Sequence, residues 1–251
     1  MHLLSPGPSV DDRALEDLYA YPTELTRPYV QVNFVASADG AATVSGRSRG
    51  LSSPADKKVF ALGRDLADVV LVGAGTALTE GYRGVKHTEL RAARRSRLGL
   101  SDVPPIAVVT GRGSVDPTSP LVAHTTVPPI VLTSDAAPVE WRKAMADAGA
   151  DVVVAGEDRV DPAGALDALA DRDLLRVCCE GGPTLFADLI AADLVDQLCL
   201  TVAPLLTGAG AVRVADGLPA KEPLPLTLES VLSDEGFLML RYRKATPSGS
   251  E

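Results

Sequence analysis

The chain has 251 residues, of which 46% are apolar and 23% charged, so it carries enough apolar side chains for a large buried core. Its formal net charge of −9 argues against a nucleic-acid or anionic-membrane surface that covers the whole protein. The longest apolar runs have the length of strands and are too short to span a membrane, so we expect a soluble protein.

The first 26 residues are predicted to form a helical extension. Apolar residues follow one another at helical spacing from Asp11 to Tyr21, and Pro22 ends the pattern. Met1 to Tyr21 contains prolines and acids rather than a basic stretch followed by an apolar run, which is not typical of a secretory signal. We therefore expect a cytoplasmic location.

The cysteines and histidines favour neither a disulfide framework nor a metal site. Cys178, Cys179 and Cys199 all lie in apolar runs, and two of them are adjacent. We interpret them as small core residues in a reducing compartment. No C-x-x-C or H-x-x-x-H spacing occurs, so no tightly bound metal is predicted.

Strand-length apolar runs alternate with amphipathic segments through most of the chain. A first strand is expected over residues 29–36, and a helix begins at Ser53 as N-cap with Pro54 at its first position. Continuous apolar runs, typical of strands covered on both faces, lie at 69–72, 106–110, 130–133, 152–154 and 176–179. Amphipathic segments lie near 140–148, 163–170 and 184–192. This alternation predicts an α/β fold with a mostly parallel central sheet and helices on both faces.

The end of the chain follows a different pattern. A strand is expected over 197–203, followed by a glycine-rich loop. Residues 224–233 and 237–243 then form a predicted antiparallel hairpin across Asp234-Glu235-Gly236. We assign residues 27–245 to one domain and expect 246–251 to be a disordered tail.

Two glycine-rich segments directly follow predicted strands, where ligands of open α/β sheets bind. They are Gly73-Ala74-Gly75-Thr76 and Glu180-Gly181-Gly182-Pro183-Thr184-Leu185. Glycines let the backbone approach an anion, and the N-terminus of a following helix offers free N–H groups to it. Either segment is equally an ordinary strand-to-helix turn, so the phosphate-binding and packing interpretations both stay open at this point.

A third segment joins the first predicted strand to the first long helix. Residues 33–40 end a strand in polar groups, and residues 45–54 form a loop rich in serine, glycine and arginine. Such a loop suits a flexible cover over a site, although Asp39-Gly40 could also be a simple turn.

Together and in this order, these segments resemble the reductase domain of riboflavin biosynthesis, the C-terminal half of the bifunctional deaminase-reductase RibD. The similar stretches are VQVNFVASADGAATVSGRSRGLSSPAD, VVLVGAGTAL and CCEGGPTLFADLIAADLVDQLCLTVAPLLTGAGA. The resemblance spans roughly Arg27 to Lys244, and its last segment is the most specific. It implies a dihydrofolate-reductase-like fold, NADPH as hydride donor and a homodimer. No H-x-E…P-C-x-x-C deaminase signature occurs, so a stand-alone reductase is expected.

The resemblance also implies the positions of site residues. Those expected at the cofactor are Gly50, Gly73, Gly75, Thr76, Gly181, Gly182, Pro183, Thr184 and Leu185. Those expected at the substrate, a pyrimidine or pterin, are Asn33, Asp39, Ser48, Arg64 and Glu180.

The stretch after the first glycine-rich turn departs from the family. The family has Asp-Asp-Pro-x-Leu-Thr, whereas this chain has Thr79-Glu80-Gly81-Tyr82-Arg83-Gly84. Glu80 keeps the acidic position that the family implies for catalysis, one methylene longer, and is our candidate catalytic residue. A solvated loop carboxylate is the alternative.

Six basic residues form an island in this acidic chain, namely Arg83, Lys86, Arg91, Arg94, Arg95 and Arg97. They either form a solvated helix face or attract an anionic substrate or the 2′-phosphate of the cofactor.

Three functions remain in competition. The leading one is NADPH-dependent reduction of 5-amino-6-(5-phosphoribosylamino)uracil to its ribityl product. The alternatives are an NADPH-dependent dihydrofolate or pterin reductase on the same fold, and a nucleotide-binding protein with little turnover.

Overall fold

The computed structural model describes residues 7–217 and 222–245, so the predicted tail 246–251 lies outside the described residues. The strands are β1 (Tyr29–Ser37), β2 (Val69–Gly73), β3 (Ile106–Val109), β4 (Ile130–Thr133), β5 (Asp151–Val154), β6 (Arg176–Cys179), β7 (Gln197–Ala203), β8 (Leu226–Asp234) and β9 (Phe237–Lys244). The α-helices are α1 (Asp12–Tyr19), α2 (Pro54–Leu66), α3 (Ala74–Glu80), α4 (Glu89–Arg97), α5 (Pro120–Ala123), α6 (Val139–Asp147), α7 (Pro162–Ala170) and α8 (Pro183–Ala191), and η1 (Ser48–Leu51) is a 3₁₀ helix.

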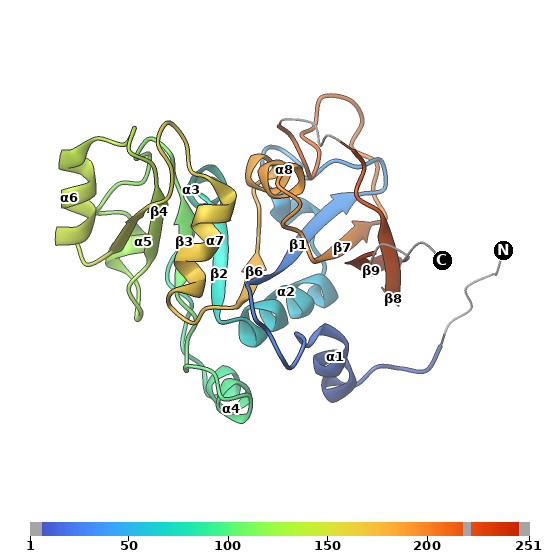
Figure 1. Cartoon of the computed structure of the whole chain (residues 1–251). Coiled ribbons are helices and arrows are strands. Elements are labelled where there is room, and N and C mark those ends of the chain that lie inside the picture. Colours follow the sequence, from blue (N-terminus) through green and yellow to red (C-terminus); the bar gives the residue numbers. More distant parts are fainter. Residues whose placement is uncertain (1–6, 218–221, 246–251) are drawn as a thin grey trace, which may run out of the picture.

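The strands form one sheet in the order β5-β4-β3-β2-β6-β1-β7-β9-β8 (Figure 1). Every pairing from β5 to β7 is parallel, whereas β9 runs antiparallel to both β7 and β8. β6 lies between β2 and β1, so that Val177 is in register with Val69 on one side and Val30 on the other. The predicted parallel sheet with a C-terminal antiparallel hairpin is confirmed.

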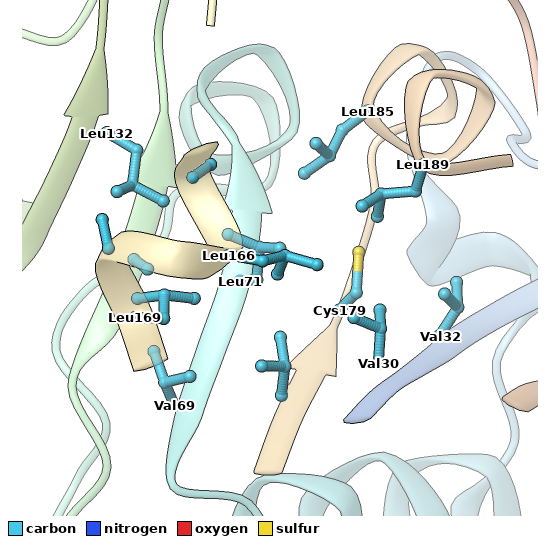
Figure 2. Packing of buried hydrophobic residues seen from close by; sticks show 14 of the residues in the cluster. Val30, Val32, Val69, Leu71, Leu132, Leu166, Leu169, Cys179, Leu185 and Leu189 are labelled. Carbon is cyan, nitrogen blue, oxygen red and sulfur yellow. The ribbon is translucent and has the colours of Figure 1, made fainter. Parts of the chain in front are cut away.

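Alternate residues of the central strands pack against different helices, which explains why these strands are apolar throughout. Val69 and Leu71 of β2 belong to the core beneath α7 and α8, and Figure 2 shows this packing around Leu166 and Leu189. Val70 and Val72 belong instead to a second core that includes Ala74 and Ala77 of α3. Each fully buried side chain of this kind contributes about 1.5–3 kcal/mol to folding.

The N-terminal helix α1 packs onto the same body. Leu15 and Tyr19 share a third core with Val59 and Leu62 of α2 and with Met239 of β9. Asp11 caps α1 by accepting a hydrogen bond from the Ala14 amide.

Most of the basic island joins helices together. Arg94 and Arg97 both form ion pairs with Glu16 of α1. Arg91 and Arg94 pair with Asp65 near the end of α2. Arg95 is fully buried and donates to the carbonyls of Arg64, Asp65 and Ala67, which the end of α2 would otherwise leave unpaired. The basic residues among 91–97 therefore form neither a solvated helix face nor a free anion site. Their ion pairs and hydrogen bonds hold α1, α2 and α4 together.

Candidate active site

A cleft of about 660 Å³ opens at the carboxyl ends of β1, β2 and β6, where the sequence pattern predicts ligand binding. Eight of the predicted site residues line it, namely Asn33, Ser48, Arg64, Thr76, Glu80, Glu180, Gly182 and Pro183. Seven others are not among the lining residues, namely Asp39, Gly50, Gly73, Gly75, Gly181, Thr184 and Leu185. The structure thus brings the predicted catalytic group together with four of the predicted substrate residues and three of the cofactor residues.

The two glycine-rich turns touch each other beside the cleft. The amide of Gly73 donates to the carbonyl of Gly181 at 2.7 Å. Gly181 has a φ of +77°, and a Cβ there would lie 2.5 Å from Cζ of Phe34. A Cβ on Gly182 would lie 2.1 Å from the hydroxyl oxygen of Thr76. Packing alone therefore requires glycine at both positions. This supports the packing interpretation of the two turns, and the phosphate-binding interpretation stays open.

The turn after β6 also begins a helix. Gly182 is the N-cap of α8 and Pro183 its first residue, so no side chain caps the first turn. The first amide groups of α8 thus remain available to an anion in the cleft.

Arg64 and Glu180 form a bidentate ion pair across the cleft wall. Nε of Arg64 donates to Oε1 of Glu180 at 2.6 Å, and Nη2 donates to Oε2 at 2.7 Å. The Glu180 side chain is 1% exposed and that of Arg64 19%. Burial alone would lower the pKa of Arg64, but the Glu180 carboxylate more than offsets this and raises it. The pair therefore places a fixed, charged guanidinium at the surface of the cleft.

Glu80 is the last residue of α3, and Gly81 turns the chain away with a φ of +70°. Oε1 of Glu80 accepts a hydrogen bond of 2.8 Å from the amide of Ser48, at the start of η1. The loop predicted to cover the site is therefore tied to the end of α3 by the candidate catalytic carboxylate.

Asn33 carries an unmet hydrogen-bond donor. It is 7% exposed and lines the cleft from β1. Its Nδ2 atom is buried without a hydrogen-bond partner among residues 7–217 and 222–245. This atom is closed off from the cleft, and a Cβ on Gly63 of α2 would lie 3.7 Å from it.

Asp39 joins two loops through its carboxylate. Its carboxylate accepts hydrogen bonds from the amides of Thr207 and Gly208, at 3.0 and 2.8 Å, and from the hydroxyl of Ser37. The Ser37 hydroxyl first, and then these amides, hold the pKa of Asp39 at about 2. The residue anchors the loop after β7 to the loop after β1, and contact with the substrate stays a prediction.

Sequence reasoning overlooked several residues of the cleft. Lys57, Phe60, Tyr82 and Arg49 line it. Arg83 and Lys86, which belong to the predicted basic island, line it as well. Within the described part of the chain, Arg49, Lys57, Arg83 and Lys86 form no ion pair. A signal existed for the α2 residues, because Lys57, Phe60 and Arg64 follow one another at helical spacing and share a face.

The described residues also bear on metal binding and on membrane spanning. Among the described residues, no three histidine, cysteine or acidic side chains gather as a metal site would require. No helix in the same residues combines the length and apolar character needed to cross a bilayer.

The sheet order and the cleft at its carboxyl edge define a dihydrofolate-reductase-like reductase fold. Dihydrofolate reductase from Enterococcus faecalis, solved in complex with NADP(H), superposes with a TM-score of 0.50 at 15% identity, covering 87% of this chain and 97% of that one. This likeness shows the fold alone.

The particular family follows from the sequence match. The RibD C-terminal domain matches residues 28–238, and the chain belongs to that family. It is 33% identical over 194 residues to the 2,5-diamino-6-ribosylamino-4(3H)-pyrimidinone 5′-phosphate reductase of Archaeoglobus fulgidus, covering 76% of this chain and 87% of that protein. A pyrimidine reductase-like protein from Corynebacterium diphtheriae superposes with a TM-score of 0.78 at 27% identity, covering 87% and 92% of the two chains. The predicted membership of the riboflavin-biosynthesis reductases is confirmed.

Proposed function

We propose that the protein is an NADPH-dependent reductase of a ribosylamino-pyrimidine 5′-phosphate, which it converts to the ribityl compound. The proposal rests on the set of residues that line one cleft. Thr76 and Gly182 from the two glycine-rich turns line it, as do the Glu80 carboxylate and the cations Lys57 and Lys86, which form no ion pair with a described residue. The name of the Archaeoglobus relative supports the same substrate class.

The residues present fit a dinucleotide with phosphate groups. Open space lies over the first turn of α3, because a Cβ on Gly75 would meet no atom within 4 Å. The uncapped first turn of α8 offers amide donors beside it. Thr76 and the run from Gly182 to Leu185 would hold the pyrophosphate and the adjoining ribose.

The chemistry divides between the cofactor and the chain. When bound, the reduced nicotinamide supplies the hydride. The ribosylamine in its open C=N form takes that hydride at carbon, and its nitrogen must gain a proton. Glu80 would deliver this proton directly or through a water molecule. Lys57 and Lys86 would hold the phosphate, and Asn33 would lie beside the pyrimidine.

The test is NADPH oxidation with separate substrates. The protein is mixed with 5-amino-6-(5-phosphoribosylamino)uracil, with its 2,5-diaminopyrimidinone counterpart, and with dihydrofolate. We expect oxidation with at least one pyrimidine and a product two mass units heavier. Turnover of dihydrofolate alone would favour the pterin alternative. NADPH binding without turnover of any substrate would favour the nucleotide-binding protein.

The preference for NADPH over NADH is assigned to Arg112. Val109 at the end of β3 is in register with Gly73, and adjacent strands lie about 4.8 Å apart. The loop that holds Arg112 therefore starts close to the glycine-rich turn at Gly73, where the cofactor is expected. The hydroxyl of Ser134 donates to the carbonyl of Gly111 at 2.7 Å and steadies this loop. Arg112 is exposed and has no ion pair with a described residue.

Arg112→Ala is expected to raise the Kd of NADPH about 10- to 100-fold, because a lost charge-assisted hydrogen bond costs about 1.5–3 kcal/mol. The Kd of NADH should stay within about 2-fold of the wild-type value, since NADH lacks the 2′-phosphate. Calorimetric titration measures both. Arg13→Ala, on the exposed side of α1, is the control. An equal loss for the two nucleotides would remove Arg112 from this role.

The expected homodimer is assigned to the hairpin end of the sheet. β8 is the last strand in the sheet order, so its outer edge is unpaired within the sheet. Leu226, Leu228 and Leu238 of this hairpin are 41%, 47% and 40% exposed. An exposed apolar edge is typical of a surface that pairs with another chain.

Light scattering after size exclusion should give twice the chain mass of 26.1 kDa. Leu228→Lys is expected to shift the protein to the monomer, because it places a charge on the apolar edge. Leu90→Lys, at a 70% exposed leucine of α4, should leave the dimer intact. A monomeric wild type would contradict the assignment.

A further inference from the structure

Tyr82 occupies the stretch in which this chain departs from its family. The left-handed Gly81 that ends α3 redirects the backbone, and the Tyr82 amide then donates to the carbonyl of Ala77 at 2.8 Å. This bond fixes the backbone of Tyr82, whose side chain lines the cleft. The residue is therefore held in place independently of any ligand.

The phenol of Tyr82 completes the arrangement around Glu180. It donates to Oε2 of Glu180 at 2.5 Å, the oxygen that also accepts from Nη2 of Arg64. Oε1 is taken by Nε of Arg64. Each carboxylate oxygen thus has at least one donor, and Glu180 is held from two sides.

Two aromatic rings also confine the Arg64 guanidinium. Its central carbon lies 4.6 Å from the centroid of the Phe60 ring and 5.2 Å from that of the Tyr82 ring. Cations at such distances are attracted to the faces of aromatic rings. Of the guanidinium nitrogens, Nη1 has no hydrogen bond to a described residue, so the fixed group keeps one pair of N–H donors for the cleft.

The phenol remains a donor throughout the useful pH range. Burial, and next the charge of Glu180, raise the pKa of Tyr82 well above that of an ordinary tyrosine. No ionised phenol therefore competes with the Glu180 carboxylate for Arg64.

We propose that Tyr82 is a positioning residue for the substrate, which acts by holding the Glu180 carboxylate and the Arg64 guanidinium so that Nη1 of Arg64 meets the substrate in one orientation. This inference rests on the proposed function.

The test compares Tyr82→Phe with the wild type and with Tyr242→Phe. Tyr242 lies on β9, in register with Leu198 of β7, and is not among the residues that line the cleft. Tyr82→Phe should raise the KM for the pyrimidine phosphate about 10-fold, because a hydrogen bond to a charged group is lost. Its kcat should change less than 3-fold, and the Kd of NADPH less than 2-fold. Tyr242→Phe should match the wild type in all three.

A second arm tests whether Tyr82 acts through Arg64. In an Arg64→Lys background, which lacks the bidentate pair, Tyr82→Phe should raise KM by less than 2-fold. Calorimetry of the pyrimidine phosphate with the cofactor-free protein should show the same non-additivity in Kd. If Tyr82→Phe has wild-type kinetics, or if the effects of the two substitutions on KM are additive, Tyr82 does not position the substrate through Arg64. The proposed function would not be affected by that result. Absence of turnover by the wild type would overturn the proposed function and, with it, this inference.

Discussion

Gly182→Val is expected to raise the Kd of NADPH at least 100-fold while the protein stays folded. A Cβ at this position would lie 2.1 Å from the Thr76 hydroxyl oxygen, so the branched side chain must displace Thr76 and enter the space between the two glycine-rich turns. The backbone itself is not the obstacle, because Gly182 has an extended conformation with φ −76°. The damage should therefore be confined to the site.

Overpacking of this kind costs about 1–3 kcal/mol, which lowers Tm by roughly 2–4 °C per kcal/mol in a chain of this size. Calorimetric titration with NADPH and thermal unfolding measure the two effects. Gly7→Val is the control, since a Cβ there meets no atom of a described residue within 4 Å. A Gly182→Val protein that binds NADPH with the wild-type Kd would show that the β6–α8 turn is packing only.

Glu80→Gln is expected to lower kcat about 10²–10⁴-fold, the usual effect of removing a general acid. The amide oxygen of glutamine can still accept from the Ser48 amide, so the tie between α3 and η1 is retained and only the ability to take up and release a proton is lost. The Kd of NADPH should therefore stay within about 2-fold. Steady-state kinetics on the substrate that the wild type reduces provide the measurement.

Two companion variants separate chemistry from loop placement. Glu80→Asp restores the residue that the family resemblance implies and should keep measurable activity. Glu80→Ala removes the acceptor for Ser48 as well as the proton, so its KM should rise in addition to the loss in kcat. If Glu80→Gln behaves like the wild type, Glu80 serves only to hold η1, and proton delivery passes to water.

The layout of the fold could be predicted because its signals are local. The runs 130–133, 176–179 and 197–203 match β4, β6 and β7 residue for residue, since apolar strands bounded by turn residues have few other stable conformations. The Ser53–Pro54 start of α2 was equally plain, and the Ser53 hydroxyl does accept from the Asp56 amide. The four-residue α5 was missed, because so short a helix shows no periodicity.

The pairings that the sequence pattern did not reveal join side chains that lie far apart along the chain. No residue next to Arg95 in the sequence indicates that its guanidinium is buried against the end of α2. The link from Asp39 to Thr207 crosses 168 positions, and that from Tyr82 to Glu180 crosses 98. Glycine patterns and a family resemblance located the cleft, but charge pairing within it depends on distances that a linear pattern does not contain.

Because β6 lies between β2 and β1, the middle of the sheet cannot form until residue 179 is available. β1 pairs only with β6 and β7 in the described sheet, so during synthesis it must wait, with both edges open, for strands that emerge much later. Pairings of such long range slow folding and lengthen exposure to aggregation. A ribosome-bound chain that stops before Glu180 also lacks the partner of Arg64, 116 positions earlier. The capacity to bind a ligand is thus acquired late in synthesis, and the nascent N-terminal half is the part most in need of protection.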